Sequence, residues 1–531
     1  MSSSDKHIIW QIVEVVLGIA IGALVTLSVV RYRNAKHLID IRYTDWRKLN
    51  LVLDMVEQNY VDTINQEEMT DAAIVAALSK LDPHSVYLPP VQLSASEEEL
   101  AGNFDGIGIQ FNVPNDTAIV LEVIAGGPSE KVGLLPGDRL LKVDDQVIAG
   151  VQFPQDSMVR RMKGPSGTKV TVTVKRGPEV IPFEITRGKI PVHSVDAAFM
   201  LRDTVGYLRL GKFSRTTFQE CHEAALRLRD EGMRHLIFDL RDNSGGYMDQ
   251  SLLLSNDFLS VGDTLVYLEG RHRKREVYRA DGRGALQDIG LTVLISENSA
   301  SASEIFAGAI QDNDRGLVVG RRSFGKGLVQ EPFFFSDNSG IRLTVARYYT
   351  PSGRCIQKPY GSENEYAYDI YNRYRDGEVF SADSVHIDTT DVHHTRSGRK
   401  VYGGGGIMPD VFVPMDTTRA TAFYLACSRK ATQMRFASQV FDRHASRLLS
   451  IDAYPEMDRF LDGLDLKRSF TEFARKEDGI SCTEAEWNAS AAYLLPQLRA
   501  LIARYSRLGE NAFYKYYLPV DDTVRKALET L

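Results

Sequence analysis

The sequence predicts an α/β fold in the central part of the chain, with helical segments before and after it. Apolar runs of strand length, rich in β-branched residues, alternate there with stretches in which apolar residues recur every three or four positions. This alternation is typical of strands connected by helices. Both ends of the chain, about 45–100 and 417–531, show helical periodicity only. The clearest central elements are predicted at Val205–Leu210, Phe218–Arg229, His235–Leu240, Leu291–Ile295 and Leu317–Val319.

The size and composition of the chain are those of a globular protein with several domains. It has 531 residues, 43% of them hydrophobic and 25% charged, and a net charge of −7. This length exceeds one ordinary domain, and the acidic balance does not recommend nucleic acid as a partner. The histidines and cysteines have no metal-ligand spacing, so no metal is expected. The cysteines are expected as free thiols, although four of them allow three disulfide pairings that the sequence cannot distinguish: Cys221, Cys355, Cys427 and Cys482.

The stretch from Gly290 to Gln330 contains the strongest candidates for chemistry. A strand pattern ends at Ser296, serines follow at 299, 301 and 303, and a helical pattern begins directly after them. Unpaired N–H groups at a helix N-terminus attract negative charge, so this turn suits a developing oxyanion. The alternative is that Ser and Glu at a helix start form only an N-cap and a capping box.

Lys326, which stands between two glycines, is a candidate activator for one of these serines. A desolvated lysine has a lowered pKa and can take a proton from a nearby hydroxyl. No G-x-S-x-G elbow surrounds Ser301, so an α/β-hydrolase is not indicated. The spacing of Gly320, Gly325 and Lys326 imitates a P-loop, but Gly327 stands where Ser or Thr should bind magnesium, and a strand pattern follows. A nucleotide site is therefore not expected.

The strings SASASEI, QDNDRG and SFGKGLVQ in this stretch closely resemble the C-terminal processing peptidases, also called tail-specific proteases. These are serine peptidases with a Ser–Lys dyad. The resemblance implies that Ser301 is the nucleophile, Lys326 the general base and Gln330 the residue that orients the lysine. It also implies a ClpP/crotonase-like sheet for the core and no cofactor.

An oxyanion hole is also implied by the resemblance. One arm is the backbone N–H of Ala302, and the other belongs to the turn DLRDNSGG at the end of a predicted strand, at Gly245 or Gly246. Without the resemblance, paired glycines after a strand indicate only a turn that permits positive φ and leaves N–H groups bare.

Residues 103–190 resemble a PDZ domain, through the string AGGPSEKVGL from Ala125 and the PGD that follows it. Gly127 and Ser129 replace the usual Ser and Ala, but both are small and should preserve the fold. PDZ domains add an extended peptide to a sheet edge and hold its terminal carboxylate on backbone N–H groups. A helix at about Pro154–Lys163 would form one wall of the groove. A module that only docks on its neighbour is the alternative. The implied carboxylate loop consists of Gly106, Ile107, Gly108 and Ile109.

The first residues, 1–35, are predicted to be a transmembrane anchor. Ile8 to Val30 is a mostly apolar run of 23 residues without a convincing cleavage site after it, which favours an uncleaved anchor. Arg31, Arg33 and Lys36 follow the span, and the positive-inside rule would place the rest of the chain in the cytoplasm. The family resemblance implies the opposite orientation, with the catalytic part in the periplasm, and we adopt it.

The remaining boundaries follow from composition and periodicity. A helical segment is predicted over 36–102, and it ends in the family string LDPHS, where a structural turn rather than a catalytic His84–Ser85 pair is expected. The α/β peptidase domain is predicted over 191–416, with a polar, tyrosine-rich surface insert at about 360–400. A helical C-terminal domain, for assembly or substrate docking rather than chemistry, is predicted over 417–531.

Together these observations predict a membrane-anchored serine endopeptidase of the C-terminal processing type. Its expected partners are proteins or peptides with free C-termini, captured by the PDZ domain, and the membrane; a homo-oligomer or an adaptor protein is left open. The alternative is a non-catalytic PDZ scaffold of the cell envelope, and a third interpretation is an envelope assembly platform. A lysine with an unusually low pKa would favour the enzyme over both.

Overall fold

The computed structural model describes residues 16–28, 47–113, 116–124, 126–361, 366–386, 388–418 and 420–531. The chain divides into two units, residues 1–77 and 78–531. Within the described residues, no helix combines the length and apolar character that crossing a membrane requires. Most of the predicted anchor lies outside the described residues, and only its residues 16–28 are seen, as a helix.

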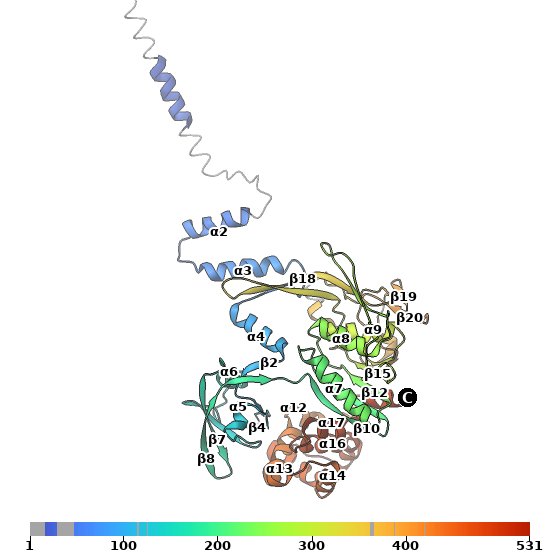
Figure 1. The fold of residues 1–531 in the computed structure, drawn as a ribbon. Coiled ribbons are helices and arrows are strands. Elements are labelled where there is room, and N and C mark those ends of the chain that lie inside the picture. Colours follow the sequence, from blue (N-terminus) through green and yellow to red (C-terminus); the bar gives the residue numbers. More distant parts are fainter. Residues whose placement is uncertain are drawn as a thin grey trace, which may run out of the picture. The chain divides into compact units, whose positions relative to one another are not determined.

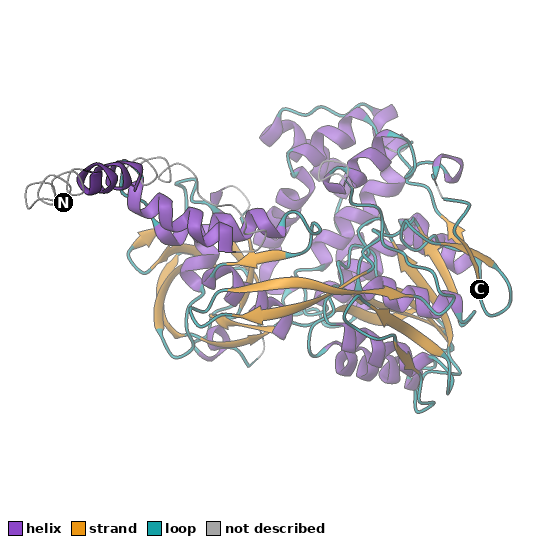
Figure 2. Cartoon of the chain, turned by 90° about the horizontal axis from the view of Figure 1, so that it is seen from above, coloured by secondary structure: helices purple, strands orange, loops and turns teal. Residues whose placement is uncertain are grey.

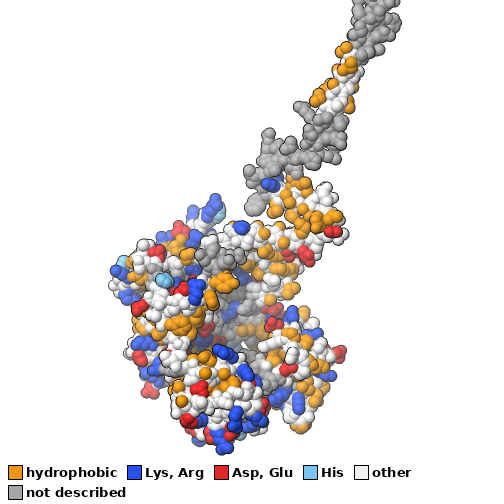
Figure 3. Space-filling model, turned by 180° about the vertical axis from the view of Figure 1, so that it is seen from behind, with side chains coloured by type: hydrophobic (Ala, Val, Ile, Leu, Met, Phe, Trp, Pro, Cys, Tyr) orange, Lys and Arg blue, Asp and Glu red, His pale blue; other side chains and the backbone are white. Residues whose placement is uncertain are grey.

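The first unit consists of short helices, in agreement with the helical pattern of its sequence (Figure 1). They are α2 (Arg47–Asn59) and α3 (Gln66–Leu78), which runs to the boundary of the unit. No residue of α2 is buried, and Leu49, Val52 and Met55 are exposed on it. Figure 3 shows hydrophobic side chains exposed on these helices.

A six-stranded sheet forms the centre of the second unit. Its order is β10-β11-β12-β15-β16-β21, and all neighbours are parallel except β10 and β11. Asp239 pairs with Leu294, so the carboxyl ends of β12 and β15 lie next to each other. The strands predicted at 205–210, 235–240, 291–295 and 317–319 are all present in this sheet. The bounds are β10 Val195–Arg202, β11 Val205–Leu210, β12 His235–Asp239, β15 Gly290–Ile295, β16 Leu317–Gly320 and β21 Val411–Phe412.

Helices cover both faces of this sheet, and Figure 2 shows helices on either side of the strands. One face packs against α7 (Thr217–Asp230), α8 (Met248–Phe258) and α9 (Ala302–Asp312). The other face packs against the last residues of the chain, which form α17 (Gly509–Tyr517), the 3-10 turn η3 (Leu518–Val520) and α18 (Asp522–Glu529). The apolar strand residues of this second face contact Leu518, Val524 and Ala527. The C-terminal helices therefore complete the core of the α/β domain.

A second sheet is built around the long strand β18. On one side β18 pairs with β17, and on the other with β1 and β13, which in turn pairs with β14. The pairing of β1 with β18 places the LDPHS turn beside β18, whose neighbour on the other side, β17, begins two residues after Lys326. The bounds are β1 Val86–Leu88, β13 Thr264–Glu269, β14 Glu276–Arg279, β17 Leu328–Phe334 and β18 Gly340–Tyr349.

Residues 103–191 form a module with its own hydrophobic core. Its sheet has the order β3-β4-β5-β7-β8, with β6 paired to β5, and the β2–β9 pair joins its two ends. The predicted helix near residues 154–163 is present as α6. The bounds are β2 Asn103–Gly106, β3 Ile109–Asn112, β4 Ala118–Val123, α5 Pro128–Lys131, β5 Arg139–Val143, β6 Gln146–Val147, α6 Gln155–Met162, β7 Lys169–Arg176, β8 Glu179–Thr186 and β9 Gly188–Pro191.

The C-terminal region before α17 is a helical bundle with an aromatic-rich core. All four cysteines are free thiols in the structure, with Cys221 and Cys427 buried and the other two half-buried. The bundle consists of α12 Ala422–Arg429, α13 Thr432–Leu448, α14 Tyr454–Asp462, α15 Leu466–Asp478 and α16 Glu484–Ala503. One further helix, α4 (Pro90–Ala101), lies between β1 and β2 in the chain.

The tyrosine-rich insert contains α11 (Asp369–Arg375), the 3-10 turn η2 (Ala382–Ser384) and the hairpin of β19 (Val392–His394) and β20 (Lys400–Tyr402). The prediction of a purely surface segment is wrong for part of it, because Tyr366 and Arg373 are buried. The sequence could not predict their burial, because both side chains are buried with polar partners and do not belong to a periodic apolar pattern.

Candidate active site

Ser301 lies in the sharp turn between β15 and α9. Its backbone has φ 56° and ψ −113°, a conformation that residues with a side chain rarely adopt. Such a conformation costs about 1–3 kcal/mol and persists only when the surroundings hold it. The neighbouring serines do so: Ser299 Oγ donates to the Leu240 carbonyl at 2.8 Å and Ser303 Oγ to the Asn243 carbonyl at 2.9 Å. Both are fully buried, whereas Ser301 is half-buried and lines a cleft. Of the three serines, the middle one is therefore the one presented to a substrate.

Glu304 connects the turn that contains Ser301, here called the serine turn, to residues 323–326, here called the lysine loop. Its carboxylate is fully buried and accepts the backbone N–H of Ser301 at 2.9 Å and of Lys326 at 2.8 Å. The other oxygen accepts the Gly325 N–H at 2.7 Å and the Ser323 hydroxyl at 2.5 Å. Burial raises the pKa of this carboxyl group, and the hydrogen bonds oppose that rise. The sequence suggested only a capping box here, and the bonds to residues 323–326 give Glu304 a second role.

Lys326 points its ammonium group at Gln330, whose Oε1 accepts from Nζ at 2.9 Å. Burial, together with the charge of Arg342, lowers the pKa of Lys326 to about 8. The lysine is still mostly protonated near physiological pH, but a far larger fraction of it is neutral than at the ordinary pKa of a lysine, and the neutral form is the one that a general base requires. Gln330 is itself oriented, because its Nε2 donates to the His84 carbonyl oxygen.

The LDPHS turn thus supports the lysine through its backbone. The His84 ring contacts the Tyr366 hydroxyl at 2.5 Å, and burial and the Lys326 charge lower the pKa of His84 to about 4. A neutral, half-buried imidazole with this partner is consistent with the structural turn that the sequence predicts. Asp82 holds the same turn by accepting the Ser85 hydroxyl at 2.6 Å.

The Tyr348 hydroxyl lies between the backbones of the two candidate catalytic residues. It is 2.7 Å from the Lys326 carbonyl oxygen and 3.2 Å from the Ser301 carbonyl oxygen, and the side chain is buried. Arg373 of the insert supports the lysine loop from another side by donating to the Ser323 and Phe324 carbonyls at 2.8 and 3.2 Å. Neither residue was expected from the sequence, because each contact joins segments that are distant along the chain.

The glycine turn after β12 faces Ser301. A Cβ on Gly245 would fall 2.8 Å from the Cβ of Ser301, so only glycine permits this approach. The Gly245 N–H donates to Asn243 Oδ1 at 2.9 Å. Within the described residues, no hydrogen bond uses the N–H of Ala302 or of Gly246. The geometry therefore favours Gly246 over Gly245 as the partner of Ala302 in an oxyanion hole.

Ser301, Lys326, Gln330, Gly245 and Gly246 all line one cleft of about 710 Å³. Ala302 is buried directly beside it, at the first position of α9. The cleft is lined by charged side chains and by an apolar wall with side chains from α8, α9, β13 and β17. These are Met248, Leu268, Ile305 and Leu328, with Pro332 and Phe334 further along β17.

The predicted carboxylate loop, Gly106 to Ile109, lies outside this cleft, between β2 and β3 of the PDZ-like module. Gly108 has φ 79°, which favours glycine at this turn. β3 is an edge strand of its sheet, since within the described residues it pairs only with β4. The arrangement leaves a strand edge next to the loop, as addition of a peptide strand requires.

Comparison with known proteins gives matches over the same regions. Residues 204–367 match the family described as Peptidase family S41, and residues 106–186 match the PDZ domain. The chain is 33% identical over 353 residues to a probable CtpA-like serine protease of Staphylococcus aureus strain MRSA252, covering 65% of this chain and 70% of that protein. The corresponding protein of Staphylococcus epidermidis is 32% identical over 363 residues, with 67% and 73% covered. A solved structure, the photosystem II D1 C-terminal processing protease, is similar at 27% identity and a TM-score of 0.37, with 70% of this chain and 87% of that chain covered.

Proposed function

The chain belongs to peptidase family S41 and is a PDZ-containing serine peptidase of the C-terminal processing type, and we propose that Ser301 and Lys326 are its catalytic dyad. The observation that carries this assignment is that one carboxylate oxygen of Glu304 accepts the backbone N–H of both Ser301 and Lys326, while the pKa of Lys326 is lowered to about 8. A lysine with a lowered pKa that lines the same cleft as the serine can activate the serine hydroxyl as a nucleophile.

In the proposed mechanism, neutral Lys326 takes the proton of the Ser301 hydroxyl as its oxygen attacks the scissile carbonyl. The developing oxyanion accepts hydrogen bonds from the N–H groups of Ala302 and Gly246. Lys326 then gives its proton to the leaving amine, and water releases the acyl group by the reverse sequence. Gln330 holds the lysine toward the serine throughout. Each oxyanion donor of this kind is worth about 10²–10³ in kcat.

The PDZ domain is proposed to capture the substrate by its C-terminus. The free carboxylate would bind at Gly106–Ile109 while the tail adds as a strand to the edge of β3. The apolar wall near Ser301 supports an apolar residue on the acyl side of the cleaved bond. Residues 8–30, whose sequence is long and apolar enough for a single span, would anchor the chain in the cytoplasmic membrane with the peptidase in the periplasm.

The test is cleavage of an unfolded protein with an apolar C-terminus by the full chain, with Ser301→Ala and Lys326→Ala beside the wild type. Cleavage by the wild type alone is expected. Equal cleavage by all three proteins would refute the assignment of these residues. A substrate with an amidated C-terminus tests the tail capture separately, and cleavage at an unchanged rate would refute that step only.

A further inference from the structure

The C-terminal helix α18 is joined by a buried ion pair to the turn that contains Gly246. Nη1 of Arg241 donates to both carboxylate oxygens of Asp521, at 2.9 and 2.7 Å. Asp521 is the N-cap residue of α18, and Arg241 directly follows the strand β12 and Leu240. The side chains are only 13% and 11% exposed, so solvent screens the pair weakly.

The same guanidinium group also binds Asp239 at the end of β12. Nε and Nη2 of Arg241 lie 2.9 and 2.6 Å from the carboxylate of Asp239, which is fully buried. Burial alone would raise the pKa of Asp239, but the charges of Arg241 and Arg209 outweigh it and hold the pKa well below its usual range. Arg241 therefore lies between two carboxylates, one from the sheet and one from the C-terminal helix.

These hydrogen bonds continue into the glycine turn after β12, which contains Gly246. Arg209 donates to the Arg241 carbonyl at 3.2 Å, and Asp242, next in the chain, has a φ of 64°. The Asn243 carbonyl then accepts the N–H of Ala300 at 3.0 Å, which ties the turn to the residue before the nucleophile. A shift of Arg241 would therefore be transmitted over a few constrained residues to Gly246.

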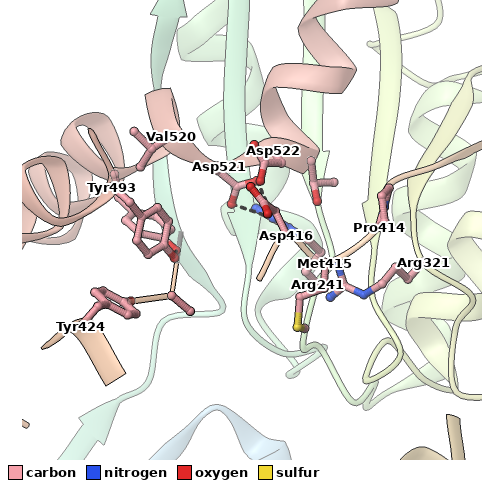
Figure 4. A pocket seen from close by; sticks show the side chains of 13 residues that line it. Arg241, Arg321, Pro414, Met415, Asp416, Tyr424, Tyr493, Val520, Asp521 and Asp522 are labelled. Carbon is pink, nitrogen blue, oxygen red and sulfur yellow. Dashed lines mark hydrogen bonds and ion pairs between the residues drawn. The ribbon is translucent and has the colours of Figure 1, made fainter. Parts of the chain in front are cut away.

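A pocket of about 320 Å³ borders the ion pair (Figure 4). In Figure 4, Tyr424 and Tyr493 stand on one side of this pocket, with Arg241 and Asp521 on the other. Leu518, Val524 and Ala527 pack this end of the chain onto the sheet, and on the side of the pocket the ion pair is the contact that joins the N-terminus of α18 to the end of β12.

We propose that Asp521 is a positioning residue for the peptidase reaction: through Arg241, the C-terminal helix holds the turn whose Gly246 N–H stabilises the oxyanion. The inference rests on the proposed function above. It gives the C-terminal region a part in catalysis, where the sequence suggested only assembly or docking. Asp521 acts on the transition state and not on substrate binding, so its loss lowers kcat and leaves KM unchanged.

The experiment uses the full chain with Asp521→Asn. Asparagine is as good an N-cap as aspartate, so it keeps the bond from the Val524 N–H, 3.0 Å in the structure, while it removes the charge that Arg241 binds. The matched control is Asp465→Asn, which changes the capping aspartate of α15, bonded to the Arg468 N–H at 3.1 Å within the helical bundle. Rates are compared at a temperature where circular dichroism shows every variant folded.

We expect kcat to fall about tenfold or more for Asp521→Asn, a part of the 10²–10³ that losing a whole oxyanion donor costs. KM and the midpoint of the pH–rate profile should stay within experimental error, and Asp465→Asn should match the wild type. Asp521→Glu should recover much of the rate, since it restores the carboxylate and the adjoining pocket has room for one more methylene. It also serves as the test if the asparagine variant does not fold.

A kcat of Asp521→Asn within twofold of the wild type would overturn the inference, as would a rise of KM that accounts for the whole loss. An Asp521→Glu variant with no more activity than Asp521→Asn would overturn it as well. Failure of the proposed function looks different: the wild type and Ser301→Ala would then be indistinguishable.

Discussion

The role of Glu304 can be tested by Glu304→Gln, a change that preserves shape and removes acceptor capacity. The carboxylate accepts four hydrogen bonds, two at each oxygen, from Ser301, Ser323, Gly325 and Lys326. In the variant, one oxygen becomes an NH₂ group that faces two donors, so two bonds are lost. Hydrogen bonds to a charged group contribute about 1.5–3 kcal/mol each, which predicts a loss of about 3–6 kcal/mol in the stability of this region.

The variant should also lose catalytic rate, because the same four hydrogen bonds hold the nucleophile and the base in one geometry. A displacement of about 1 Å between reacting groups costs on the order of 10²-fold in rate, and we expect at least that loss in kcat. The assay combines steady-state cleavage of the unfolded substrate with thermal unfolding. The Tm should decrease by about 5 °C or more, since each kcal/mol shifts Tm by about 2–4 °C in a domain of 150–250 residues.

The matched control is Glu486→Gln, which changes the same position of the capping box that begins α16. Glu486 is half-buried and accepts from the Thr483 N–H at 3.1 Å, a bond that glutamine can also accept. Both kcat and Tm should remain those of the wild type. A Glu304→Gln protein with wild-type kcat and Tm would refute the idea that this carboxylate unites the serine turn and the lysine loop.

Three further predictions concern the surroundings of the dyad. Because neutral Lys326 is the active form and its pKa is lowered to about 8, kcat/KM should rise with pH through about 8 and level off above it; a profile flat from pH 6 to 10 would contradict the lysine as base. Tyr348→Phe removes the hydroxyl that bridges Ser301 and Lys326, and a lost hydrogen bond of about 1.4 kcal/mol predicts roughly tenfold lower kcat with unchanged KM. Arg373→Met removes the two hydrogen bonds to the Ser323 and Phe324 carbonyls, while Asp369 and Glu378 keep Lys358 and Arg322 as partners. At about 1.5–3 kcal/mol for a bond from a charged donor, the variant should lose about 3 kcal/mol or more, and Arg373→Lys should retain part of that stability in urea denaturation. Equal stability of both variants with the wild type would argue against the insert as a support of the lysine loop.

The elements of the α/β core could be predicted from the sequence because their signals are local. Apolar runs at 235–240 and 291–295 and helical spacing at 218–229 correspond closely to β12, β15 and α7. Motif resemblance placed Ser301, Lys326 and Gln330 together, and the structure brings all three to one cleft. Short-range periodicity and a contiguous motif carry this information without any knowledge of tertiary contacts.

The prediction of a surface insert was wrong for two of its residues, for a complementary reason. Arg373 and Tyr366 are polar side chains in a weakly periodic stretch, and no local hydrophobic pattern predicts that they are buried. Their burial is stabilised by partners such as the Ser323 carbonyl and the His84 ring, which lie far away along the chain. A pattern of hydrophobic residues cannot reveal burial that depends on hydrogen bonds and ion pairs.

The sequence by itself therefore determined the fold class, the PDZ-like module and the identity of the candidate dyad. Only the tertiary structure decided which contacts surround the dyad. Glu304 accepts hydrogen bonds from both loops, the His84 carbonyl accepts from Gln330, and Asp521 of α18 binds Arg241 beside the glycine turn. Arg241 and Asp521 are 280 residues apart in the chain. A contact between such distant residues depends on how the helices and sheet pack in three dimensions, and a single sequence contains no local signal for it.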